Sequence, residues 1–178
     1  LTEKGEEHEV IMSGKVYHEA SCDAELPAVG DWVALDFVGD EVVIRARLER
    51  QTCFSRKVPG KSSEEQVMAA NVSIVVVVTD AGPDFNPRRL ERYFMLIDKS
   101  GAKGVVLVNK SDLFPEQQNE EVASHIRELK ADIDVHITSA VNNEGIQVLR
   151  SYMDKGVSIK VVGSSGVGKS TLVNQLLG

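Results

Sequence analysis

Two short motifs hold the residues whose types and spacing could do chemistry, and the first is typical of a phosphate-binding loop. Gly-(four residues)-Gly-Lys-Ser spans positions 163–170, between an apolar strand expected at 157–162 and a helix expected from Lys169 onward. This strand–loop–helix setting is the one that the motif requires. Glycines let successive N–H groups line one concave surface, and the helix start adds partial positive charge beneath it.

The chemistry of this loop is the binding of a nucleoside triphosphate. We expect the Lys169 ammonium to bridge β- and γ-phosphate oxygens and the Ser170 hydroxyl to occupy one position on Mg²⁺. A chance glycine-rich turn is the structural alternative. The predicted phosphate-binding residues are Gly163, Ser164, Ser165, Gly166, Val167, Gly168, Lys169, Ser170 and Thr171.

The second motif, Asn109-Lys110-Ser111-Asp112, has the composition of a guanine-binding loop and follows an apolar strand expected at 103–108. Open α/β sheets bind ligands at the carboxyl ends of their strands. The Asp112 carboxylate can accept hydrogen bonds from guanine N1–H and the exocyclic amine, a pair that adenine cannot donate. Asn109 can hold the loop together while the Lys110 stem packs across the base. Taken alone, the tetrapeptide also fits a strand-to-helix turn in which Asp112 caps the helix.

A third segment supports the guanine assignment. Small residues, Ser139 and Ala140, follow the strand expected at 134–138 and would let a backbone N–H approach the guanine oxygen. The predicted guanine-binding residues are Asn109, Lys110, Ser111, Asp112, Ser139 and Ala140. Together the motifs predict GTP. The base-binding motif precedes the phosphate loop, the reverse of the ordinary guanine-nucleotide domain, so the sequence predicts a circular permutation.

Composition indicates a soluble globular protein. Apolar residues make up 42% and charged residues 26% of the 178 positions, which is ordinary for this class. The longest purely apolar run, 74–78, is far shorter than a membrane span, and the acidic, polar start does not resemble a signal peptide. We therefore expect a cytoplasmic protein without a membrane partner. Cys22 and Cys53 lack metal spacing and are expected to be reduced thiols.

The net charge of −7 hides a local basic cluster. Residues 45–61 contain six cations against one acid, Glu49, a local charge of 6 − 1 = +5. Such a patch can attract phosphate even on an acidic molecule, although a solvated strand face explains it equally well. The candidate RNA-binding residues are Arg45, Arg47, Arg50, Arg56, Lys57 and Lys61.

The elements that must position these residues divide the chain in two. Apolar segments at 9–17, 31–38 and 41–48, with a Gly39-Asp40 turn between the last two, predict short strands. Several short strands in a small segment favour an all-β, OB-fold-like RNA-binding barrel over residues 1–58. Residues 58–63 have the composition of a linker, and we expect residues 59–178 to form a partial GTPase domain.

Strands and helices alternate in that second part, which predicts an α/β domain with a mostly parallel sheet. The expected strands are 73–79, 103–108, 134–138 and 157–162. The expected helices are 87–100, 116–131 and 143–154, followed by the helix that begins at Lys169.

The chain resembles the circularly permuted GTPases of ribosome assembly, the small-subunit-dependent GTPase A family of the RsgA, YjeQ and EngC type. The likeness extends over residues 27–33, 54–72 and 84–93 as well as the two nucleotide motifs. It implies a barrel that contacts ribosomal RNA and a GTPase that acts late in small-subunit maturation, stimulated by that subunit. A monomer is expected.

The resemblance also sets expectations for what would follow residue 178. The family's switch segment, its Asp-x-x-Gly motif and a zinc-binding domain would all lie there, so Zn²⁺ is expected only in that part. No catalytic residue is assigned, and this stretch is expected to bind nucleotide better than it hydrolyses it. We also predict that strand 157–162 lies at an edge of the sheet.

Two other functions remain open from the residues alone. A phosphate loop also serves ATP-using phosphoryl transferases, in which case Asp112 would not select the base. The barrel and the basic cluster would also fit an RNA-binding module whose nucleotide site is only regulatory.

Overall fold

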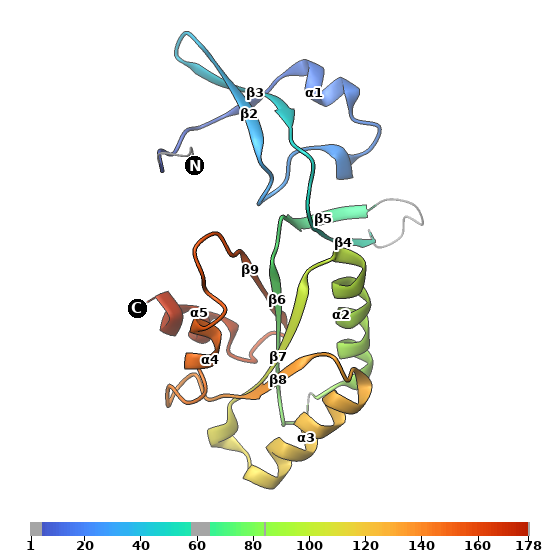
Figure 1. Ribbon diagram of the computed structural model, residues 1–178, viewed down its shortest axis with the longest axis vertical. Helices are drawn as coiled ribbons and strands as arrows, with labels where there is room; N and C mark the ends of the chain where they lie inside the picture. Colours follow the sequence, from blue (N-terminus) through green and yellow to red (C-terminus); the bar gives the residue numbers. More distant parts are fainter. Residues whose placement is uncertain (1–4, 58–64, 84, 178) are drawn as a thin grey trace. The chain divides into compact units, whose positions relative to one another are not determined.

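Strands predominate in the first part of the chain and alternate with helices in the second (Figure 1). The computed structural model describes residues 5–57, 65–83 and 85–177. Its contacts divide the chain into two compact units, Leu1–Asn71 and Val72–Gly178.

The first unit contains two small sheets. Strands β1 (Ile11–Met12), β3 (Glu41–Arg47) and β2 (Val33–Val38) form one sheet in that order, and β2 and β3 meet at the predicted Gly39-Asp40 turn. Strands β4 (Cys53–Lys57) and β5 (Glu65–Ala70) form an antiparallel pair. Among the described residues these strands do not join into one closed barrel, so the structure establishes a β-rich unit.

The strand predicted at 9–17 is wrong beyond Met12. Ser13 caps a short helix, α1 (Gly14–Glu19), because its hydroxyl accepts a hydrogen bond from the Val16 N–H. An N-capping serine stabilises the first helical turn, and here it outweighs a weak alternating pattern. A single 3₁₀ turn, η1 (Asp23–Glu25), follows before β2.

The boundary between the units lies later than the composition indicates. The predicted linker at 58–63 lies outside the described residues, but β4 and β5 on either side of it pair with each other. Residues 65–70 therefore belong with the first unit, and the contacts divide the chain after Asn71.

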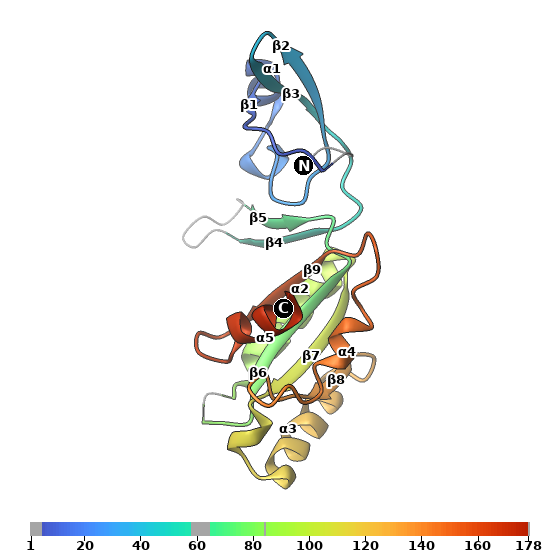
Figure 2. The same cartoon turned by 90° about the vertical axis from the view of Figure 1, so that its left-hand side faces the viewer.

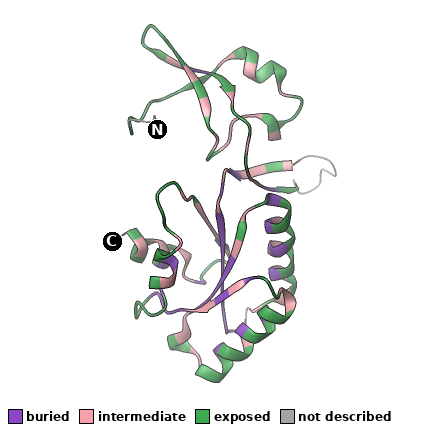
Figure 3. Ribbon diagram, viewed as in Figure 1, coloured by how far each residue is buried: buried purple, intermediate pink, exposed green. Residues whose placement is uncertain are grey.

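The second unit is built on a parallel sheet of four described strands. These are β8 (Asp134–Ile137), β7 (Lys103–Asn109), β6 (Ile74–Asp80) and β9 (Ile159–Gly163), in that spatial order. Every residue of β6 is buried, as its run of valines predicts for a strand covered on both faces. Figure 3 shows this burial concentrated along β6 and β7. Strand β9 pairs only with β6 among the described strands, which confirms the predicted edge position.

Helices cover both faces of the sheet. Helices α2 (Pro87–Ser100) and α3 (Glu116–Leu129) lie on one face, and α4 (Gln147–Arg150) and α5 (Lys169–Leu177) lie on the other (Figures 1 and 2). Leu149 of α4 and Leu172 of α5 pack against alternate side chains of β6. No helix in the described ranges is long and apolar enough to cross a membrane.

Local signals explain where these helices begin and end. The Asn86 side chain caps α2, Pro87 occupies its first turn, and Gly101 ends it in a left-handed conformation. The helix predicted at 143–154 is wrong at its start, since Asn143 and Gly145 both have positive φ and only Gln147–Arg150 is helical.

Candidate nucleotide-binding site

The two predicted motifs meet at the carboxyl edge of the parallel sheet. Strands β6, β7 and β9 run in the same direction, so the residues that follow them come together at one rim. Asp80 ends β6 opposite Asn109, which ends β7, and Gly163 ends β9.

Asn109 joins the guanine motif to the phosphate loop. Its Nδ2 donates a hydrogen bond to the Val167 carbonyl at 2.8 Å. Its Oδ1 accepts from the Thr138 hydroxyl at 3.2 Å and from the Ala140 N–H at 3.1 Å. The side chain is 1% exposed and ties together three loops that are distant in sequence. The predicted role of Asn109 in holding the loop thus has a definite geometry.

Two glycines of the phosphate loop are required by close backbone approaches. A Cβ on Gly168, whose φ is +95°, would lie 2.4 Å from Asn109 Nδ2. A Cβ on Gly163, whose φ is +145°, would lie 2.3 Å from the Val78 carbonyl oxygen. Both distances are below any real contact, so these glycines seat the phosphate loop against β6 and the guanine motif.

Asp112 is exposed at the rim, and its carboxylate is held in place by Ser139. The Ser139 hydroxyl donates to Asp112 Oδ1 at 2.5 Å and accepts from the Asn142 N–H at 3.1 Å. The backbone amides that were expected to face the base have internal partners, since the Ser139 N–H donates to the Glu144 carbonyl and the Ala140 N–H to Asn109. The Ser139 hydroxyl, and not its backbone amide, is therefore the group that contacts the Asp112 carboxylate.

Lys110 has a partner that the sequence did not indicate. It occupies a left-handed conformation with φ of 61°, and its Nζ lies 2.9 Å from Asp80 Oδ2. The Asp80 side chain is 9% exposed, and its Oδ1 accepts from the Gly82 N–H at 3.1 Å. The sequence signal for this pair is an acidic residue, Asp80, at the end of β6, the strand that precedes β7 in the chain. Using this signal requires the register of β6 against β7, which the sequence does not provide.

The phosphate loop already holds its lysine in place. Lys169 Nζ donates to the carbonyls of Gly163 at 3.0 Å and Ser164 at 2.5 Å, so the ammonium lies within the loop. Ser170 and Thr171 lie exposed in the first turn of α5, and Ser165 and Gly166 are exposed at the tip of the loop.

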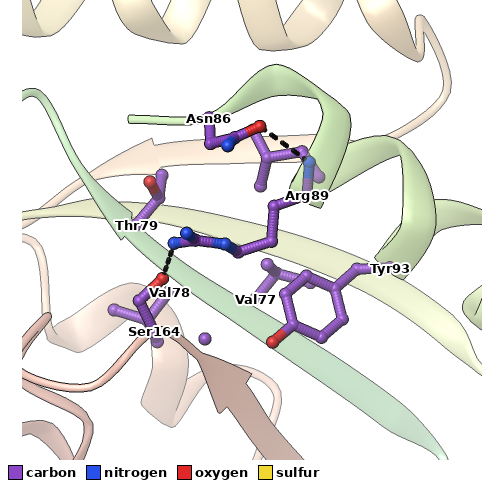
Figure 4. A pocket seen from close by; sticks show the side chains of 9 residues that line it. Val77, Val78, Thr79, Asn86, Arg89, Tyr93 and Ser164 are labelled. Atoms are coloured by element: carbon purple, nitrogen blue, oxygen red, sulfur yellow. Dashed lines mark hydrogen bonds between the residues drawn. The ribbon is translucent and has the colours of Figure 1, made fainter. Parts of the chain in front are cut away.

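A further cation reaches the loop from α2. The Arg89 guanidinium donates from Nη1 to the Ser164 hydroxyl, as Figure 4 shows. This contact cannot be predicted from the sequence, because it depends on how α2 packs on β6, the strand that pairs with β9.

The basic cluster of the first unit does not form one free surface. Arg50 binds both carboxylate oxygens of Asp31, at 2.8 and 2.7 Å, and also the Ala24 and Leu26 carbonyls. The side chains of Arg50 and Asp31 are only 11% and 1% exposed, so this pair holds the fold. The hydrogen bond to Asp31 raises the pKa of Arg50, and the opposing effect of burial is smaller.

The other candidate RNA-binding residues differ in their surroundings. Arg47 donates to the Glu25 and Leu48 carbonyls, Arg45 pairs with Asp36 at 2.7 Å on an exposed surface, and Arg56 donates to Gln66. Lys57 is exposed, and Lys61 lies outside the described residues.

Comparison with known proteins decides the family. The family model described as RsgA GTPase matches residues 47–178. This chain belongs to the RsgA GTPase family. It is 41% identical to the small ribosomal subunit biogenesis GTPase RsgA of Opitutus terrae, over 93% of this chain and 47% of that relative. It is 39% identical to the protein of the same name from Syntrophotalea carbinolica, over 96% of this chain and 48% of that relative. The chain thus spans about half the length of the curated relatives that it matches.

Solved structures agree with the RsgA assignment. YjeQ from Thermotoga maritima superposes with a TM-score of 0.68 at 26% identity, over 93% of this chain and 55% of that one. YloQ, whose structure is described as that of a circularly permuted GTPase, gives a TM-score of 0.59 at 23% identity, over 93% and 54% of the two chains, and indicates the fold alone. The prediction of a circularly permuted GTPase fold is confirmed.

Proposed function

We propose that this chain is the RNA-contacting and nucleotide-binding part of a GTPase that acts in maturation of the small ribosomal subunit. The observation that supports this proposal most directly is the side chain of Asn109, which bonds the phosphate loop at Val167 and the third loop at Ala140. One ligand with a base at one end and phosphates at the other fits such a joined pair of motifs. The names of the relatives, small ribosomal subunit biogenesis GTPases, support the proposed process.

Base selection is assigned to Asp112, with Lys110 beside the base. The Asp112 carboxylate accepts hydrogen bonds from guanine N1–H and the exocyclic amine. A 2.5 Å hydrogen bond from the Ser139 hydroxyl holds this carboxylate in the orientation that the base requires. The ion pair with Asp80 holds the Lys110 stem across the place of the base. A carboxylate fixed in this way discriminates strongly against adenine, which would leave it unpaired.

Phosphate binding is assigned to the loop amides and to Lys169. On binding, the Lys169 ammonium exchanges the Gly163 and Ser164 carbonyls for phosphate oxygens, so one set of charge-assisted hydrogen bonds replaces another. The exposed Ser170 hydroxyl in the first turn of α5 fits a magnesium ion that accompanies the nucleotide. When bound, Mg²⁺ neutralises charge that develops on the phosphate oxygens.

Contact with ribosomal RNA is assigned to the first unit, which we propose corresponds to an OB-type barrel. Among the described residues, the cations suited to this role are the exposed ones, Arg45, Arg56 and Lys57, since Arg50 is paired with Asp31. Lys61 stays a candidate from the sequence. We also propose that the small subunit stimulates GTP hydrolysis, as the family resemblance implies.

The proposal is tested by nucleotide-dependent stability. A ligand that binds only the folded state adds about 2.7 kcal/mol of stability at a hundredfold excess over its dissociation constant. We expect GDP to raise the melting temperature of the second unit, ADP to have no effect, and Lys169→Ala to abolish the GDP effect. Equal stabilisation by ADP would instead support an ATP-using phosphoryl transferase and would remove the proposed role of Asp112.

A further inference from the structure

Ser164 in the phosphate loop is contacted by two cations, one at its backbone and one at its side chain. Lys169 Nζ donates to its carbonyl at 2.5 Å, and the Arg89 guanidinium donates to its hydroxyl. In Figure 4 the Arg89 side chain extends from the first turn of α2 past Thr79 toward Ser164. The contact links residues 75 positions apart, so the packing of α2 on the sheet creates it.

The charge on Arg89 has no acidic partner in the described part of the chain. Among the described residues its guanidinium makes one hydrogen bond, to a neutral hydroxyl. Arg89 is half-buried and lines a small hollow together with Val78, Asn86 and Tyr93 among others. The neighbouring Arg88 is exposed to solvent. A guanidinium removed from water without a counter-charge is unfavourable, and a nearby anion relieves that cost.

The ligand proposed for this loop is such an anion. The guanidinium fork is suited to phosphate geometry, and a partly buried cation is screened less than one in water. The γ-phosphate adds negative charge that a diphosphate does not have, so a cation in contact with the phosphate loop favours the triphosphate more than the diphosphate.

We propose that Arg89 is a positioning residue of the nucleotide site, which fixes the phosphate loop through Ser164 and increases its preference for a nucleoside triphosphate. This inference rests on the proposed function, because it deepens the account of the same site. It adds α2 to the elements that respond to the third phosphate.

The test compares four variants of the full chain by titration with a fluorescent GDP and with a fluorescent, non-hydrolysable GTP analogue. We expect Arg89→Ala to weaken the triphosphate about tenfold and the diphosphate no more than about threefold. Arg89→Lys, which keeps the charge but not the fork, restores part of the loss. Ser164→Ala removes the hydrogen bond but keeps the cation, so its loss is smaller than that of Arg89→Ala. Arg88→Ala is the matched control and binds both nucleotides like the parent.

Melting temperatures of all variants separate this role from a purely structural one. Equal weakening of both nucleotides by Arg89→Ala, with a lower melting temperature and no rescue by lysine, would overturn the inference. So would binding that matches the Arg88→Ala control for both nucleotides. Failure of the parent chain to bind either nucleotide would overturn the proposed function as well. If the parent chain binds nucleotide and Lys169→Ala abolishes that binding, the proposed function is supported even where the inference about Arg89 fails.

Discussion

Replacement of Asn109 by alanine tests whether one side chain joins the two nucleotide motifs. The substitution removes three hydrogen bonds, to the Val167 carbonyl, the Thr138 hydroxyl and the Ala140 N–H, at a position that is 1% exposed. The former partners of Asn109 on Val167, Thr138 and Ala140 belong to buried residues and cannot form hydrogen bonds with solvent instead. Solvation therefore does not offset the loss.

The expected loss of stability follows from these contacts. A buried hydrogen bond contributes about 1 kcal/mol net, and an unsatisfied buried partner costs about 1–3 kcal/mol. Three such bonds imply that Asn109→Ala lowers the free energy of unfolding of the second unit by about 3 kcal/mol. The Thr138 hydroxyl can rotate toward another acceptor, which keeps the expected value near the lower end of the sum.

Urea unfolding followed by far-ultraviolet circular dichroism measures this loss, since α2 and α3 are the longest helices described and both lie in the second unit. Asn174→Ala on the exposed side of α5 is the matched control and is expected to change stability by less than about 0.5 kcal/mol. Asn109→Ala should also lose stabilisation by GDP, although Asp112 and Lys169 are intact. A stability loss equal to that of the control, with normal GDP binding, would refute the joining role.

Three further substitutions test separate parts of the molecule. Asp112→Asn should weaken guanine nucleotide binding at least tenfold and favour xanthine nucleotide, measured by competition titration; unchanged base preference would exclude this carboxylate from base selection. Asp80→Asn removes the charge that holds Lys110 and should weaken GDP about fivefold without a large change in melting temperature, so parent-like affinity would show that the ion pair is dispensable. Burial alone would raise the pKa of Asp31, but the hydrogen bonds from Arg50 outweigh this effect and lower the pKa. The ionised carboxylate therefore stabilises the first unit above about pH 4, and this stability is lost as the pH falls through the lower pKa of the folded state. Asp31→Asn should therefore reduce stability at neutral pH and flatten its acid dependence, measured by urea unfolding with the fluorescence of the chain's one tryptophan; an acid dependence like that of the parent would contradict this assignment.

The parts of the fold that the sequence predicted are those set by local chemistry. A run of valines predicts a strand buried on both faces, and the helix expected at 87–100, with Pro87 in its first turn, has the bounds of α2. The glycine spacing of the phosphate loop predicts its backbone, since Gly166 and Gly168 both have positive φ. Each of these signals acts within a few residues, and no knowledge of tertiary packing is needed to interpret it.

The contacts that the sequence could not predict depend on elements that meet only after folding. Asp80 contacts Lys110 because β6 and β7 align in a particular register. Arg89 contacts Ser164 because α2 packs on β6, the strand that pairs with β9. The pairing of Arg50 with Asp31 is of the same kind. Arg50 belongs to the basic cluster in the sequence, but in the structure it is a largely buried residue paired with Asp31. Charge counted along the chain could not predict this, because it does not distinguish a solvated cation from a paired one.

The order of the motifs along the chain matters less than the strand edge at which they meet. Parallel strands place their carboxyl ends on one rim whichever strand comes first, so β7 can deliver Asn109 to the phosphate loop from upstream. The hydrogen bond between Asn109 and Val167 spans 58 positions. Closing a longer segment costs little more, about 0.6 kcal/mol for each doubling of its length, which is less than one of the hydrogen bonds that Asn109 makes. A permuted chain can therefore keep the energetics of the site, provided that the sheet retains its strand order and Asn109 retains its three partners.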